Sequence, residues 1–87
     1  MSFLYKRELL SCGDVAVINC SHQCNVLLLD DPNFRNYRNG GKYKYFGGFF
    51  RSLPAKIVVP ASGYWNVVLD LGGRSATVRH SIGFLRA

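Results

Sequence analysis

Residues 35–51 hold the side chains whose types and spacing best suit binding chemistry. This segment contains five basic residues, six aromatic residues and four glycines, with no acidic residue among them. Lysine and arginine contact phosphates and tyrosine rings stack on bases, so the combination suits nucleic acid or another polyanion. Exposed aromatic rings beside arginine suit a protein interface equally well. The predicted ligand-binding residues are Arg35, Tyr37, Arg38, Lys42, Lys44, Tyr45 and Arg51.

The same aromatic side chains have a second interpretation, as the core of a small domain with the lysines as its solvated rim. Six aromatic rings in one stretch are difficult to bury on one side of one strand, so we expect some of them to be exposed. The sequence leaves open which rings point inward. The residues concerned are Tyr37, Tyr43, Tyr45, Phe46, Phe49 and Phe50.

The positive charge of the chain is concentrated in one part of it. Between Asp31 and Asp70 there are six basic residues and no acidic residue, which equals the net charge of +6 of the whole chain. The five basic residues outside this window balance the five acidic ones. A local field of this kind attracts anions.

Metal binding has a weaker basis. Cys12, Cys20, His22 and Cys24 supply the ligand types of a structural zinc site, but the Cys20-x-His22-x-Cys24 spacing lacks the two-residue gap of common zinc knuckles. A Cys20–Cys24 disulfide is an alternative. Isolated cysteines are the default, so we expect no metal and no cofactor.

Catalysis also has a weak basis, because a nucleophile needs a base that a third group orients. His22 lies in a short polar loop and His80 in a predicted strand. Asp70 is the most interesting acid, although a structural role at a turn, or a pair with Arg74, explains it. Glycine-rich phosphate loops are absent from the sequence. The sequence therefore indicates a protein that is not an enzyme.

Length and composition indicate one compact domain over residues 1–87. Hydrophobic residues make up 48% of the chain and charged residues 18%. An odd number of cysteines and the lack of a secretory signal indicate reduced thiols in the cytoplasm. The longest aliphatic run, residues 26–29, is far short of the roughly 20 residues of a membrane span, so we expect no membrane partner.

The apolar pattern predicts a series of short strands. We expect them at residues 15–18, 25–29, 42–46, 56–59, 64–71 and 75–85, and residues 3–10 are expected to form a short strand or an extended arm. Residues 15–18 and 25–29 are expected to form a hairpin, and so are the last two strands around Gly72-Gly73. Gly47-Gly48 is expected to interrupt the alternating pattern as a bulge or a turn.

One helix is predicted after residues 25–29. Asp31 is the expected N-cap, with Pro32 at the first helical position and Gly40-Gly41 as the stop. Phe34 and Tyr37 are three residues apart and share a face, so they must pack on the sheet because two turns are not stable alone. The predicted fold is mainly β, a small sandwich or incomplete barrel of six to seven short strands with one short helix and much irregular backbone.

Three stretches of the sequence resemble a known family. They are residues 33–40 (Asn-Phe-x-x-Tyr-Arg-x-Gly), residues 42–48 (Lys-x-x-Tyr-x-Gly-Gly) and residues 59–73 (Val-Pro-x-Ser-Gly-x-Trp-x-Val-Val-x-Asp-Leu-Gly-Gly). The chain resembles DUF1883, a small bacterial domain family of unknown function that is found alone or beside Toll/interleukin-receptor (TIR) domains. The resemblance implies a small β module with a sensing or interaction role by analogy, and it supplies no functional residues.

These observations predict a cytoplasmic, non-enzymatic binding module. Its expected partner is another protein or a second copy of the chain, bound through residues 35–51 with Tyr64 and Trp65 nearby. The alternative is a nucleic-acid or polyanion binder. Carbohydrate binding is a distant third reading, since few acidic and amide side chains lie in the segment to fix sugar hydroxyls.

Overall fold

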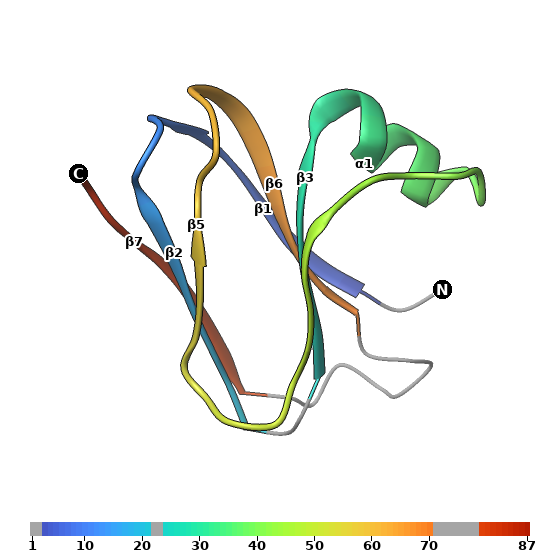
Figure 1. Ribbon diagram of the computed structural model, residues 1–87. Coiled ribbons are helices and arrows are strands. Elements are labelled where there is room, and N and C mark those ends of the chain that lie inside the picture. The colour runs from blue at the N-terminus through green and yellow to red at the C-terminus, as the bar shows by residue number, and fades with distance from the viewer. Residues whose placement is uncertain (1–2, 22–23, 71–78) are drawn as a thin grey trace.

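A computed structural model describes residues 3–21, 24–70 and 79–87, which contain seven strands and one helix (Figure 1). In chain order these elements are β1 (Phe3–Leu10), β2 (Val15–Cys20), β3 (Cys24–Asp30), α1 (Asp31–Arg38), β4 (Phe46–Phe50), β5 (Ala55–Val58), β6 (Gly63–Asp70) and β7 (His80–Leu85). The predicted mainly β fold with one short helix is confirmed. Among the described residues, no helix has the length and apolar character that a membrane span requires.

The strands form two antiparallel sheets that face each other (Figure 1). One has four strands in the order β1-β6-β3-β4, and the other has three in the order β5-β2-β7. The sheets remain open rather than closing into a barrel, so β1 and β4 are the edges of the larger sheet. The sandwich alternative of the prediction is therefore the observed one.

The core between the sheets follows the period-two alternation of their strands. It consists of Leu10, Ala16, Ile18, Val26, Leu28, Ala55, Ile57, Val59, Trp65, Val67 and Leu69. A second cluster lies between the larger sheet and α1, and consists of Leu27, Leu29, Phe34, Tyr37 and Val68. Strands β3 and β6 thus bury both of their faces, and this explains their central position in the four-stranded sheet.

The predicted hairpin of residues 15–18 and 25–29 is wrong, because β2 and β3 belong to different sheets. The described parts of the other predicted hairpin, β6 and β7, also lie in different sheets. The reason is burial: Leu27 and Leu29 need a cover on the face opposite Val26 and Leu28, so β3 pairs with β6 and β4 under the helix. The Gly72-Gly73 turn itself and the first part of the predicted last strand lie outside the described residues.

Helix α1 begins one residue earlier than predicted. Asp30, and not Asp31, is the N-cap, and its Oδ1 accepts a hydrogen bond from the Asn33 backbone N–H at 3.0 Å. Asp31 is thereby free to bind Arg7 on β1, with 2.6 Å between Arg7 Nη2 and Asp31 Oδ2. The helix ends at Arg38, and Gly40 takes a positive φ of +76°, as a glycine stop predicts.

The predicted strand at residues 42–46 is wrong for most of its length. Residues 41–45 have no regular structure, and β4 begins only at Phe46. The Lys44 backbone N–H donates to Asn33 Oδ1 at 2.8 Å, which ties this stretch to the helix instead of to a strand. Gly47 and Gly48 lie inside β4 with φ values of +113° and +144°.

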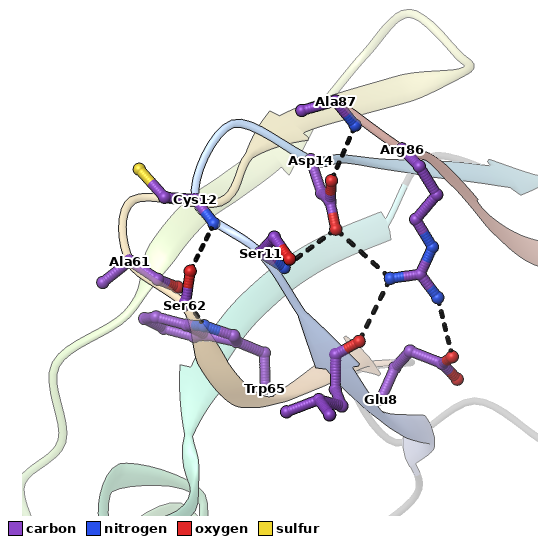
Figure 2. A network of polar contacts seen from close by, with 10 residues as sticks. Glu8, Ser11, Cys12, Asp14, Ala61, Ser62, Trp65, Arg86 and Ala87 are labelled. Carbon is purple, nitrogen blue, oxygen red and sulfur yellow. Dashed lines mark hydrogen bonds and ion pairs between the residues drawn. The ribbon is translucent and has the colours of Figure 1, made fainter.

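One buried carboxylate joins the end of β7 to the turn between β1 and β2 (Figure 2). Asp14, which is 2% exposed, accepts hydrogen bonds from the backbone N–H groups of Ser11 at 2.8 Å and Ala87 at 2.7 Å. Arg86 Nη1 adds a contact at 3.2 Å, and its Nη2 binds Glu8 at 3.0 Å. The hydrogen bond from Ala87, then that from Ser11, holds the pKa of Asp14 below its usual range.

This network predicts an acid-sensitive contribution to stability. Because the folded pKa of Asp14 lies below the unfolded one, its contribution is complete above the unfolded pKa of about 3.9 and is lost as the pH falls through the folded pKa. We expect Asp14→Asn to lower the free energy of unfolding at pH 7 and to flatten its decline between about pH 5 and pH 2. Urea unfolding at several pH values measures this. Asp30→Asn is the control, since asparagine caps a helix as well as aspartate does. If the free energy of unfolding declined equally between about pH 5 and pH 2 in Asp14→Asn and in the unmodified chain, the assignment would be contradicted.

Candidate functional site

The structure places the predicted ligand-binding residues in two groups. Arg35 and Arg38 are exposed on helix α1. A separate group of exposed residues follows the helix and runs along the outer edge of the larger sheet, through β4; we call residues 42–51 the edge segment. It carries Lys42, Lys44, Tyr45 and Arg51.

Tyr37 is the exception, because it is buried rather than exposed. Its side chain is 3% exposed and packs against the sheet beside Phe34. Its hydroxyl donates to Asp70 Oδ2 at 2.7 Å. Burial, and then this hydrogen bond, raises the pKa of Tyr37, so the hydroxyl stays protonated at neutral pH. Tyr37 therefore belongs to the core, and Asp70 acts structurally on β6, through Tyr37; Arg74 lies outside the described residues.

The other aromatic residues of the segment divide differently. Tyr43, Tyr45, Phe46 and Phe49 are 37%, 47%, 48% and 55% exposed, while Phe50 is half-buried against the core between the sheets. Phe46 and Phe49 lie on β4, an edge strand of the described sheet, and Tyr43 and Tyr45 lie in the irregular stretch before it. Surface aromatic area is thus present along the edge segment, as the number of rings in it predicted.

The cations of both groups lack acidic partners within the part of the chain that the structure describes. The ion pairs found there use Arg7 and Arg86, with Asp31, Glu8 and Asp14 as their partners. Of the eight described cations without an ion pair, five belong to these two groups: Arg35, Arg38, Lys42, Lys44 and Arg51. Their field is therefore available to an external anionic group.

A cavity of about 430 Å³ adds residues that the sequence did not single out. Strand β1 supplies Tyr5 and Arg7, β6 supplies Asn66, and α1 supplies Arg35 and Arg38 among others. Arg7 and Asn66 are direct partners in the β1–β6 pairing, so only the sheet brings them together. A periodicity argument gives no signal for this site, because its residues come from elements far apart in the chain.

The predicted cysteine cluster is only partly described. Cys12 lies before β2 and Cys20 at its end, and neither forms a disulfide among the described residues. Cys20 is the register partner of His80 on β7. Among the described residues there is no group of three His, Cys, Asp or Glu side chains that would hold a metal ion. His22 and the Cys24 side chain lie outside the described part, so the zinc and disulfide alternatives that include them stay open.

Comparison with known proteins identifies a family and nothing more specific. No curated protein matches the chain, and no solved structure matches it. A family model described as "Domain of unknown function (DUF1883)" matches residues 1–87, which is the whole chain. The match includes β6 with Trp65 and Asp70, the helix with Tyr37, and the glycines of β4. The chain therefore belongs to the DUF1883 family.

Proposed function

We propose that this domain is a non-enzymatic interaction module of the cytoplasm that binds a protein through its edge segment. The partner is either a different protein or a second copy of the chain. The observation that carries the proposal is the exposure of Tyr45, Phe46 and Phe49 along an open edge of the larger sheet. Apolar rings of this size beside cations are typical of the anchors of protein interfaces.

The charges of the edge segment define the chemistry of the partner. Lys42 and Lys44 precede the exposed rings and Arg51 follows them, and all three are exposed. An acidic surface with an apolar centre would complement this arrangement and accelerate association. The backbone of β4 contributes less, because the strand is only five residues long and offers few groups for pairing.

The acidic residues support a role outside catalysis. Asp14 and Asp30 accept hydrogen bonds from backbone N–H groups, Asp31 is bound by Arg7, and Asp70 accepts from Tyr37. Each of these carboxylates holds elements of the fold together. The resemblance to a family that also occurs beside TIR domains agrees with an interaction role by analogy.

The protein-binding proposal predicts a selective effect of one aromatic side chain. Phe49→Ser removes a ring that is 55% exposed, and we expect it to weaken association by about tenfold or more, since burial of such a ring contributes about 1.5–3 kcal/mol. The control is Leu9→Ser, which removes an equally exposed apolar side chain from β1, at the opposite edge of the sheet.

Two measurements cover the two kinds of partner. Sedimentation velocity over a concentration series detects self-association of the chain, and quantitative retention of cellular proteins on immobilised chain detects a different protein. In either assay, we expect Phe49→Ser to weaken association and Leu9→Ser to leave it unchanged. A chain that stays monomeric and retains no protein, or that loses binding equally in both variants, would contradict the proposal.

The nucleic-acid alternative is supported by a separate observation, the five exposed cations of helix α1 and the edge segment, which form no ion pair in the described part of the chain. If all five contact phosphates of duplex DNA, the logarithm of the binding constant falls with the logarithm of the salt concentration with a slope near −4.5. Fluorescence anisotropy at several salt concentrations measures the slope. Binding with this slope that Phe49→Ser leaves unchanged would favour the alternative over the protein partner.

A further inference from the structure

The cavity between β1, β6 and helix α1 has the charge of an anion-binding site. Three guanidinium groups line it, from Arg7, Arg35 and Arg38, together with the one carboxylate of Asp31, for a net charge of +2. Asp31 is already fully engaged: Arg7 binds it through Nε at 3.1 Å and through Nη2 at 2.6 Å, and Asn66 Nδ2 donates to it at 2.8 Å. These bonds leave Arg35 and Arg38 available, and arginine forks match the oxygens of a phosphate group.

Asn66 forms the buried floor of the cavity. It is 0% exposed and lines the cavity beside Asp31. Its Nδ2 donates to Asp31 Oδ1 at 2.8 Å and to the carbonyl oxygen of Leu29 at 3.3 Å. The Asp31 carboxylate is therefore bound both by Asn66 and by Arg7, and the positive charge of Arg35 and Arg38 exceeds the negative charge in the cavity.

The wall and the size of the cavity complete the ligand's description. The ring of Tyr5 is half-exposed and packs on Phe34, with ring centroids 4.8 Å apart, so it offers a fixed apolar surface. The volume of about 430 Å³ lies within the range of small-molecule sites. Arg7 is held rigidly at the other side, between Asp31 and the ring of Tyr64, whose centroid is 3.9 Å from its guanidinium carbon.

We propose that this cavity binds a small soluble phosphorylated molecule. Arg35 and Arg38 bind the phosphate, and the Tyr5 ring contacts the rest of the molecule. This site lies over β1 and β6, away from the β4 edge, so it is independent of the proposed protein-binding function.

Ligand chemistry tests the role of the phosphate without a change in the core. The full chain is titrated with glycerol 3-phosphate, with propyl phosphate, which has the same charge, and with glycerol, with ¹H–¹⁵N NMR spectra as the readout. We expect saturable binding of both phosphates, with shifts at Arg35 and Arg38, and no binding of glycerol.

Paired charge variants test the role of the arginines. We expect the Arg35→Gln, Arg38→Gln double variant to lose affinity by about tenfold or more. The Lys6→Gln, Lys56→Gln double variant, which removes the same charge from exposed positions outside the cavity, is expected to retain it. An equal loss in both double variants, or no saturable binding of either phosphate, would overturn the proposal. A chain that sediments with phosphatidic acid vesicles but does not bind glycerol 3-phosphate would also overturn it, because the site would then bind a lipid surface and not a small soluble molecule.

Discussion

Substitution of Gly47 by alanine is expected to destabilise this domain by about 3–5 kcal/mol, which is a large part of the stability of a small domain. Two causes add. The φ of Gly47 is +113°, a conformation that residues with a Cβ rarely adopt. The new Cβ would also overlap the carbonyl oxygen of Val26 on β3 and lie 3.0 Å from Ile57 Cδ1 on β5. The carbonyl is backbone in a central strand, so β4 must move away from β3.

Gly48→Ala separates the two causes. Gly48 has a similarly unfavourable φ of +144°, but a Cβ there would meet no atom within 4 Å. We therefore expect only the backbone cost, about 1–3 kcal/mol. Thermal and urea unfolding followed by circular dichroism compare the two variants. Equal losses for Gly47→Ala and Gly48→Ala would show that β4 does not lie against β3 as described.

Replacement of Trp65 by alanine is expected to cost about 3–5 kcal/mol. Trp65 is 7% exposed, belongs to the core between the sheets and contacts the ring of Phe46, with centroids 6.0 Å apart. Its Nε1 also donates to the carbonyl oxygen of Ala61 at 2.8 Å, which holds the turn before β6 (Figure 2). Loss of the indole leaves a large cavity and an unpaired turn carbonyl together.

The neighbouring Tyr64 provides the matched control on the same strand. Its ring is 47% exposed and its main described contact is the stacking of Arg7 on its face. Tyr64→Ala is therefore expected to cost about 0.5–1 kcal/mol, the value of an exposed cation–π contact. Urea unfolding by circular dichroism measures both variants. Trp65→Ala would contradict the described core if it lost no more stability than Tyr64→Ala.

Local sequence patterns were sufficient for the class of fold and for most elements. The β-branched run at 15–18 and the alternation at 64–71 predicted β2 and β6 nearly to the residue, since a period of two depends only on neighbouring side chains. The helix with Phe34 and Tyr37 on one face was also predicted correctly, and both residues pack on the sheet. The predicted N-cap of the helix was wrong by one residue: Asp30 caps the helix, and Asp31 binds Arg7 instead. The pair between Arg7 and Asp31 joins distant parts of the chain, so local sequence patterns do not indicate it.

Strand pairing was not predictable in the same way. Both expected hairpins rested on proximity in sequence, whereas β3 and β6 pair with each other because each has two apolar faces to bury. The stretch at 42–45 alternates lysine and tyrosine as a strand would, yet Asn33 binds the backbone of Lys44 and holds it beside the helix. Periodicity describes one segment, while such contacts depend on which segments meet.

By itself, the sequence determined that this protein is a mainly β domain with a short helix, and that residues 35–51 hold six aromatic residues and five of the six excess positive charges. Only the tertiary structure decided how these residues divide: Tyr37 turns inward to Asp70, Arg35 and Arg38 face a cavity with Arg7 and Asn66, and Phe46 and Phe49 lie along the β4 edge. The physical reason is that composition fixes what must be buried or solvated. The pairing of distant strands fixes which side chains then share a surface.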